Sequence, residues 1–186
     1  YISSTVKKLG YNAFSSCYNL QMLVLPKSIS TITKSALQNL TGLKRIYFMN
    51  PSLDNISLSE SDGLKIYGFS GSTAEAYANK NDIPFVPLGD FESLELVAAP
   101  KKTKYKIGDI FDIYGIDLRA VYSSGEKVSV PPDSITGFDS TTEGVKTVTL
   151  NYETESVTFD IKVVAATGIE ITRLPVKTKY NRGEDF

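Results

Sequence analysis

The feature that most constrains this chain is a repeat of 23 residues in its first half. When the sequence is shifted by 23 residues from Val6, every compared position pairs one apolar residue with another. The aligned pairs are Val6 with Ile29, Leu9 with Ile32, Ala13 with Ala36, Phe14 with Leu37, Cys17 with Leu40, Leu20 with Leu43, Leu23 with Ile46, and Leu25 with Phe48. A unit this short cannot bury its apolar side alone, so neighbouring units must stack. The repeat therefore predicts a solenoid, and it predicts that Cys17 is a small buried hydrophobe rather than a reactive thiol.

A third, degenerate unit closes the pattern at Leu64, Ile66 and Tyr67. Ser72 and Glu75 then have the spacing of a capping box, in which a serine and a glutamate three residues later satisfy free backbone donors. We expect a capping helix at about residues 72–80, followed by a last strand at residues 83–86. A terminal unit of atypical sequence is what the end of a solenoid requires.

The spacing L-x-x-L-x-L at Leu20, Leu23 and Leu25 is the leucine-rich-repeat pattern. Residues 1–88 resemble the C-terminal end of a BspA-type leucine-rich-repeat array. The residues that carry the resemblance are Tyr11, Asn12, Ala13, Phe14, Cys17, Leu20, Ile66, Tyr67, Gly68, Gly71, Ser72, Ala74, Glu75, Tyr77, Ala78, Ile83, Pro84 and Phe85. The resemblance implies a bacterial surface protein built from short strands and short helices, and several proteins of that family are linked to adhesion.

A second repeat, of period 75, begins near residue 90. Leu94, Pro100, Tyr105, Gly108 and Phe111 recur as Ile169, Pro175, Tyr180, Gly183 and Phe186. The complete copy, residues 90–165, alternates apolar with polar residues in several short runs, which is typical of strands with one buried face. Polar turns between such strands predict an all-β sandwich.

This copy is similar to the group-3 bacterial Ig-like domain. The matching residues are Pro100, Lys102, Thr103, Tyr105, Gly108, Asp109, Phe111, Asp112, Gly115, Val121, Tyr122, Ser123, Gly125, Thr136, Gly137, Gly144, Lys146, Thr147, Val148, Thr149 and Phe159. The resemblance implies a spacer module of secreted or wall-attached proteins, and the paired Pro131 and Pro132 depart from the pattern only in a loop. The predicted fold is thus multidomain: the end of a repeat solenoid, then an Ig-like sandwich.

Residues 168–186 are interpreted as the truncated start of a second Ig-like repeat. Its partner strands are missing, so we expect it to pair with an exposed sheet edge, either of its own Ig-like domain or of a neighbouring molecule, and we favour the neighbouring molecule. Such a contact would be an artefact of truncation, and the protein is expected to be monomeric in dilute solution.

Composition excludes several classes of protein. The formal net charge is −1, which argues against nucleic-acid binding. The chain has no histidine and one cysteine, so it lacks the usual general base and the usual metal clusters. It has no apolar run long enough for a membrane span, and because it starts at Tyr1 we interpret it as a segment of a longer protein. The first 89 residues hold eight basic and five acidic side chains, and residues 90–165 hold eight and thirteen, which favours a boundary near residue 90.

Motifs that could carry chemistry are weak. Asp109, Asp112 and Asp117 do not have the spacing of a calcium loop. Glu60 and Asp62 lie in a serine-rich stretch and are interpreted as part of a loop rather than a glycosidase pair. We therefore expect no catalytic residue, no cofactor and no metal, and no enzyme activity in this segment.

The most function-like feature is a ladder on the repeat strands. Val24 lies between the inward Leu23 and Leu25, and its equivalents in the next two units are Tyr47 and Tyr67. Stacking of the strands aligns these residues in one row, beside a second outward row of Met22, Arg45 and Lys65. The predicted binding face comprises Met22, Val24, Arg45, Tyr47, Lys65 and Tyr67. Aromatic side chains beside cations are favoured at binding hot spots, and we expect replacement of both tyrosines by alanine to leave the fold intact.

The leading hypothesis is an extracellular adhesion or interaction protein on the cell surface or in the cell wall. The repeats would bind a host or bacterial surface protein or a glycan, and the Ig-like domain would be a stalk. The alternative is an accessory carbohydrate-binding or spacer region of a larger secreted enzyme. Only residues 86–90 separate the last repeat strand from the first Ig-like strand, so we expect a restricted, elongated arrangement.

Overall fold

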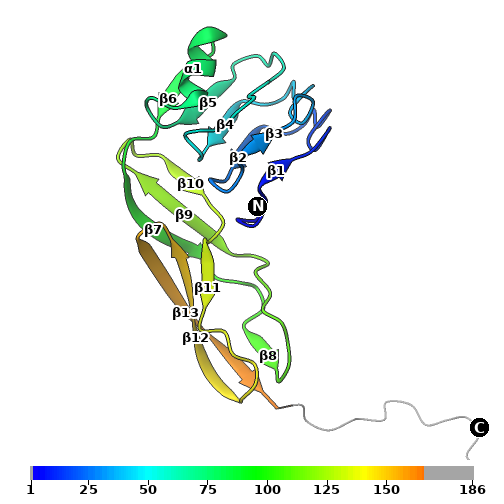
Figure 1. Ribbon diagram of the computed structural model, residues 1–186. Coiled ribbons are helices and arrows are strands. Elements are labelled where there is room, and N and C mark those ends of the chain that lie inside the picture. Colours follow the sequence, from blue (N-terminus) through cyan, green and yellow to red (C-terminus); the bar gives the residue numbers. More distant parts are fainter. Residues whose placement is uncertain (1, 166–186) are drawn as a thin grey trace, which may run out of the picture.

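The computed structural model describes residues 2–165, and it places the repeats at one end and the Ig-like region at the other end of an elongated molecule (Figure 1). The 23-residue repeat sits at the amino-terminal end, beside the Ig-like strands that follow residue 90. The structure is mostly β, and its described part contains one α-helix. The predicted pairing of residues 168–186 with a sheet edge falls outside the described residues.

The repeats stack through one parallel sheet in the order β2-β4-β5-β6. Its strands are β2 (Met22–Leu25), β4 (Arg45–Phe48), β5 (Lys65–Gly68) and β6 (Phe85–Pro87). Met22 pairs with Arg45 and Arg45 with Lys65, so the offset falls from 23 to 20 residues at the degenerate unit. The parallel register confirms the stacked repeats that the period predicts.

The opposite side of each repeat consists of turns. The short strands β1 (Lys8–Leu9) and β3 (Thr31–Ile32) pair in parallel, and turns occupy residues 11–16 and 34–39. Asn12 and Asn39 hold positive φ angles of 55° and 58° in these turns, a conformation that asparagine tolerates better than most residues. The short helices expected within the repeats are therefore replaced by turns.

Cys17 is exposed, and the prediction that it is buried is wrong. Its equivalent one repeat later, Leu40, is only 1% exposed. The same contrast separates the half-buried Phe14 from the fully buried Leu37. Leu40 and Leu37 are covered by repeats on both sides, whereas Cys17 and Phe14 lie in the first repeat that the structure describes.

The capping helix is present as α1 (Thr73–Lys80). The Glu75 backbone N–H donates to the Ser72 hydroxyl at 3.2 Å, as the capping box requires. The Glu75 carboxylate accepts from the Gly71 backbone N–H at 2.6 Å rather than from that of Ser72. Ala74 and Ala78 are fully buried against the repeat core, so the helix closes the end of the stack.

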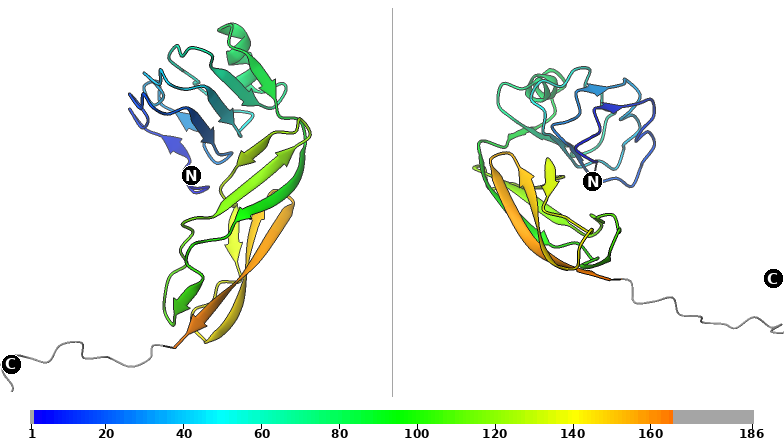
Figure 2. Two further views of the ribbon diagram at one scale, coloured as in Figure 1. Left: turned by 180° about the vertical axis from the view of Figure 1, so that it is seen from behind. Right: turned by 60° about the horizontal axis from the view of Figure 1, so that its bottom comes forward.

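The Ig-like region contains two sheets that share one core. The first has the order β10-β9-β7 and the second β11-β12-β13-β8. The strands are β7 (Phe91–Ala98), β8 (Lys104–Lys106), β9 (Asp117–Tyr122), β10 (Lys127–Ser129), β11 (Ser134–Thr136), β12 (Gly144–Tyr152) and β13 (Glu155–Val164). Leu118, Ala120 and Tyr122 point inward from β9, as their alternation predicts. The two sheets are visible below the repeats in Figure 1 and from behind in Figure 2.

Candidate binding surfaces and the junction between the two regions

The paired strands bring the six ladder residues into two rows. Val24, Tyr47 and Tyr67 form the first row across β2, β4 and β5. Met22, Arg45 and Lys65 form the second. The rows follow from the parallel register, in which equivalent residues of successive repeats lie side by side.

The two tyrosines of the first row are not open to solvent. Tyr47 is 2% exposed and Tyr67 is 7% exposed, and their rings stack with centroids 4.4 Å apart. Both belong to the core cluster that contains Leu118 and Tyr122 of the Ig-like region. Tyr47 and Tyr67 do face away from the repeat core, but the expectation that they are accessible is wrong, because the Ig-like region of the same chain covers them. Their replacement by alanine would leave a cavity, contrary to the sequence-based prediction.

A partly buried hydrogen bond joins the ladder to the Ig-like region. The Tyr47 hydroxyl donates to Glu126 Oε2 at 3.2 Å across the junction. Burial and the nearby Glu126 carboxylate raise the pKa of Tyr47 to about 12, and the same causes raise the pKa of Tyr67. Tyr47 therefore stays protonated and remains a donor at neutral pH.

A cation forms the second contact. Lys27 Nζ lies 2.7 Å from Asp133 Oδ2 and 2.9 Å from Glu153 Oε1. The same ammonium lies 5.0 Å from the centroid of the Tyr152 ring. Partial burial by itself lowers the pKa of Lys27, but the hydrogen bonds to the two carboxylates outweigh it, and the pKa is raised. Lys27 thus remains charged, and it joins the repeats to the loops that flank β11 and β12.

The connecting segment is itself tied down. Leu88 is fully buried, and its carbonyl accepts from the Ser124 backbone N–H at 3.2 Å. The Asp90 backbone N–H donates to the Ser123 hydroxyl at 2.9 Å. Gly89 holds a φ of +74°, and a Cβ there would lie 2.1 Å from the same hydroxyl. These contacts agree with the restricted arrangement predicted from the short connection.

The loop that contains Pro131 and Pro132 belongs to this junction. Both prolines are buried, and the Ser4 hydroxyl donates to the Pro132 carbonyl at 2.8 Å. Sequence reasoning treated this loop as a simple departure from the Ig-like pattern. The paired prolines were the signal that could have drawn attention to it, because two buried prolines in a loop need a surface to pack against.

The second row of the ladder stays accessible. Met22 is 44% exposed, and Arg45 and Lys65 are exposed as well. Beside Met22, a hollow of about 410 Å³ opens between the first repeat and the Ig-like region. It is lined by Ile2, Phe14, Met22, Leu23, Val24, Ser129 and Pro131. The exposed part of the predicted face is thus the second row, together with the half-buried Val24.

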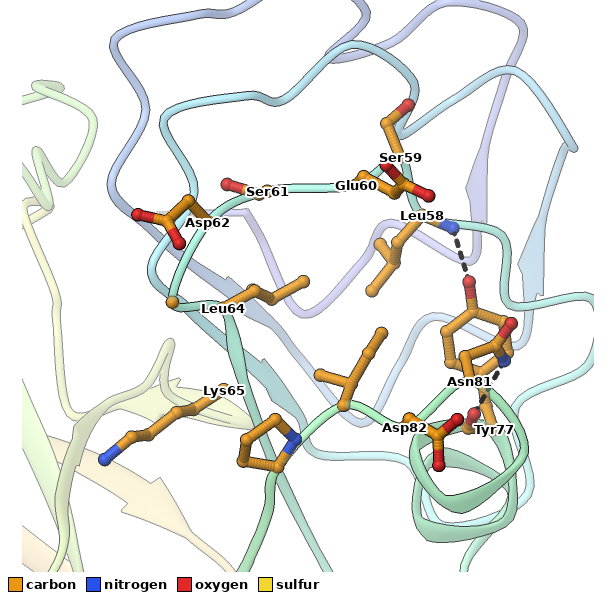
Figure 3. Close-up of a pocket in the computed structure, with 13 residues that line it drawn as sticks. Leu58, Ser59, Glu60, Ser61, Asp62, Leu64, Lys65, Tyr77, Asn81 and Asp82 are labelled. Carbon is orange, nitrogen blue, oxygen red and sulfur yellow. Dashed lines mark hydrogen bonds between the residues drawn. The ribbon is translucent and has the colours of Figure 1, made fainter.

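A hollow of about 530 Å³ lies beside the capping helix (Figure 3). Leu58 and Leu64 point into it, while Glu60 and Asp62 lie on its rim, and the Leu58 backbone N–H donates to the Tyr77 hydroxyl at 2.9 Å. Both carboxylates are exposed, so neither has the apolar surroundings that a general acid needs. They lie in a loop, as predicted.

The aspartates of the Ig-like region diverge. Asp109 accepts from Lys102 and from the Lys106 backbone N–H, which is the larger cause of its lowered pKa. Asp112 accepts from the Tyr114 backbone N–H, and Asp117 pairs with Arg119. Within residues 2–165, no group of three or more acidic or cysteine side chains is placed to hold a metal ion. Each carboxylate has its own partner, so the three do not form one site.

The repeat sheet packs against the Ig-like sheets through one shared core. Comparison with known proteins identifies each of the two regions. Residues 1–71 match the BspA type leucine rich repeat region, and residues 98–163 match the bacterial Ig-like domain of group 3. The chain therefore contains a BspA-type leucine-rich-repeat region and a group-3 bacterial Ig-like domain, and such domains are typical of bacterial surface proteins.

Two curated relatives are much longer than this chain. Pectate lyase L of Thermoclostridium stercorarium is 40% identical over 99 residues, which are 51% of this chain and 8% of the relative. An exo-beta-1,6-galactobiohydrolase of Bifidobacterium longum subsp. longum is 41% identical over 76 residues, which are 37% of this chain and 5% of the relative. The similarity thus covers a small part of each relative. Across the described residues, no helix has the length and apolar character needed to cross a membrane.

Proposed function

We propose that this chain is a non-catalytic interaction segment of a bacterial cell-surface or secreted protein. The repeats present a binding surface to a host or bacterial surface protein or to a glycan. The Ig-like region, with its two sheets forming a β-sandwich, acts as a stalk of fixed orientation. The segment would work outside the cell and as a monomer.

The junction is the observation that carries this proposal. Tyr47, Tyr67 and Leu88 share one buried core with the Ig-like sheets, and Lys27 adds an ion-paired contact at a second point. A fixed orientation reduces the entropy lost when a partner binds, because the presenting surface is already positioned. A flexible tether would not need a buried aromatic pair.

The accessible part of the ladder is the first candidate contact surface. Met22, Arg45 and Lys65 form an exposed row with one apolar and two cationic side chains. Tyr47 and Tyr67 lie beside this row on the same face of the sheet, and their burial positions the strands that carry it. The proposed contact surface is therefore Met22, Arg45 and Lys65, and the two tyrosines are positioning residues.

The test is an array of glycans and matrix proteins probed with the whole chain. A ligand found there should bind the Arg45→Ala, Lys65→Ala double variant at least about twofold more weakly, since exposed charge pairs each contribute roughly 0.2–1 kcal/mol. Lys80→Ala on α1 is the matched control, because Lys80 is also exposed but lies outside the row. Failure of the chain to bind any class of ligand would refute the proposal.

The second candidate function is an accessory region of a larger secreted enzyme. The two relatives named for polysaccharide chemistry favour it, because this chain resembles only a small fraction of each. Deleting the segment from such an enzyme should lower activity on an insoluble polymer and spare activity on a soluble oligosaccharide. Equal loss on both substrates would count against a binding role.

A further inference from the structure

A third hollow, of about 520 Å³, crosses three repeats on the side with β1 and β3. Figure 1 shows these strands on the side of the repeats turned away from β9 and β10. Lys8 pairs with Thr31 and Thr31 with Asp54, so equivalent positions of three repeats lie in one row beneath it. The hollow is lined by Lys8, Tyr11, Thr31, Ile32, Thr33, Lys34, Asn55, Ile56 and Ser57.

An exposed aromatic ring stands at this hollow. Tyr11 is 84% exposed, more than Tyr18 at 58% or Tyr114 at 67%. The Tyr114 ring lies 4.9 Å from the ammonium of Lys101, whereas no ring or cation within residues 2–165 packs against Tyr11. An amphipathic ring left in water offers an apolar face and a polar tip to a ligand. The C–H face of a pyranose is a suitable match for such a ring.

Two cations without an ion-pair partner among the described residues line the same hollow as the Tyr11 ring. Lys8 and Lys34 are exposed and form no ion pair with any described residue. By contrast, Lys27, Lys44, Lys102, Lys127 and Lys146 are all paired with carboxylates. A pair of free ammonium groups across one hollow favours an anionic ligand, because hydrogen bonds between ions are the stronger ones.

Polar groups without side-chain partners complete the lining. The Thr31 and Ser57 hydroxyls and the Asn55 amide make no side-chain hydrogen bond within the described part of the chain. The Thr33 hydroxyl oxygen is buried and has no partner there either. Hydroxyl and amide groups can both donate and accept, which suits the hydroxyl groups of a sugar. Two cations are too few to neutralise a nucleic-acid backbone, which favours a saccharide.

We propose that this hollow binds an acidic oligosaccharide. Tyr11 stacks on a sugar ring, Lys8 and Lys34 bind its anionic groups, and the hydroxyls of Thr31 and Ser57 bond to ring hydroxyls. Asp54 ends the same row of three repeats but does not line the hollow. This site rests on the proposed function, but it lies on a different face of the repeats from the second row of the ladder.

The test is a titration of the whole chain with tetragalacturonate, followed by NMR or calorimetry. Its methyl ester has the same backbone without the charge, and a sulfated tetrasaccharide tests the other common source of anionic groups. We expect the acid or the sulfated sugar to bind at least tenfold more tightly than the methyl ester. Tyr11→Ala should weaken binding about tenfold, and Lys34→Gln about threefold.

Matched control variants change an exposed tyrosine and an exposed lysine outside the hollow. Tyr18→Ala removes an exposed tyrosine of the same repeat outside the hollow, and Lys80→Gln removes an exposed lysine on α1. Both should bind as the wild type does, and Lys34→Arg should restore most of the loss. Because Tyr11 and Lys34 are exposed, the thermal unfolding of their variants should match that of the wild type.

The possible outcomes separate this site from the proposed function. Binding that is lost with Tyr11 and Lys34 but not with Tyr18 supports the site. Equal binding of the acid and its ester, or unchanged binding by the Tyr11→Ala variant, overturns it. If these sugars fail while the array finds a ligand for the whole chain, only the site is wrong. If the array also finds nothing, the proposed function falls with it.

Discussion

The repeats and the Ig-like region build their cores from contacts of different reach along the chain. In the repeats, β2 meets β4 and β4 meets β5 at offsets of 23 and 20 residues. In the Ig-like region, β13 pairs with β8, joining Val163 to Tyr105. A stack of short-range contacts is readable from a period, whereas long-range pairing must be inferred from alternation.

The boundary between the two cores does not follow the boundary between the two regions. On β4, Ile46 and Phe48 point into the repeat core, while Tyr47 and the following Met49 belong to the Ig-like core. The outer face of the repeat sheet is therefore covered at Tyr47, Tyr67 and Met49 and remains exposed at Met22, Arg45 and Lys65. A residue that faces away from the repeat core, such as Tyr47, can thus be buried in the Ig-like core.

The largest expected loss of stability comes from alanine substitutions on the two faces of β4. Ile46→Ala should destabilise the repeats by about 2–5 kcal/mol, as a large-to-small change in a core does. Tyr47→Ala should cost about 3 kcal/mol or more, and it should loosen the junction as well. Thermal unfolding followed separately in each region, for instance by NMR, would detect the difference. If Tyr47→Ala left both regions and their relative orientation unchanged, the shared core would be disproved.

A smaller effect is expected at the connecting segment. Gly89→Ala places a Cβ against the Ser123 hydroxyl and forces a side chain into a positive φ. Gly125→Ala is the control, because Gly125 has a φ of +85° but no atom within 4 Å of its built Cβ. The control should cost roughly 1 kcal/mol for the backbone alone, and Gly89→Ala about 1–2 kcal/mol more. Equal costs in denaturant unfolding would show that the Ser123 contact adds no restraint.

A still smaller effect is expected at the ion-paired contact. Lys27→Met should destabilise the protein by roughly 0.5–1 kcal/mol, because the three charged groups are all partly exposed and water screens them. A double-mutant cycle with Glu153→Gln would isolate the pair, and the coupling should shrink at high salt. A coupling that is independent of salt would mean that Lys27 acts through its packing on Tyr152.

The smallest effect at neutral pH concerns the buried tyrosines. Tyr47 and Tyr122 have pKa values raised to about 12 from the usual 10.0, mainly because burial disfavours the phenolate. Their folded pKa values exceed the unfolded ones, so their contribution is complete below pH 10 and is lost as the pH rises from 10 toward 12. Spectroscopic titration of Tyr47→Phe against the wild type should remove one late-titrating phenol. The loss of a phenol that titrates near pH 10 would contradict the buried junction.

Much of the fold could be predicted because its signals are local. The 23-residue period predicted the stacked strands, Ser72 and Glu75 predicted α1, and alternation on β9 predicted its inward residues. The errors have one cause in common. Cys17 and Tyr47 were placed by analogy with an idealised repeat, but their exposure depends on what lies on the far side of each.

The hollow beside β1 and β3 was missed for a similar reason. Tyr11 and Lys34 are equivalent positions in successive repeats, so the period contained the signal that they lie side by side. The rows on β2, β4 and β5 carry no information about the turn side of the repeats, where this hollow lies. Asn55 and Ser57 lie 23 residues after Ile32 and Lys34, so the same period places them beside this hollow as well.

The sequence by itself determined the two repeat systems, the capping helix and the order of the regions, because each is encoded in spacings of a few residues to a few tens of residues. The tertiary structure decided that the tyrosine ladder is a junction. It paired Tyr47 with Glu126 and Lys27 with Asp133 and Glu153, partners that lie far away in the chain. No periodicity links such residues, because their proximity results from how two separately folded surfaces meet. Because Tyr47 and Tyr67 are buried there, the predicted binding face is instead the contact that orients the repeats relative to the Ig-like region.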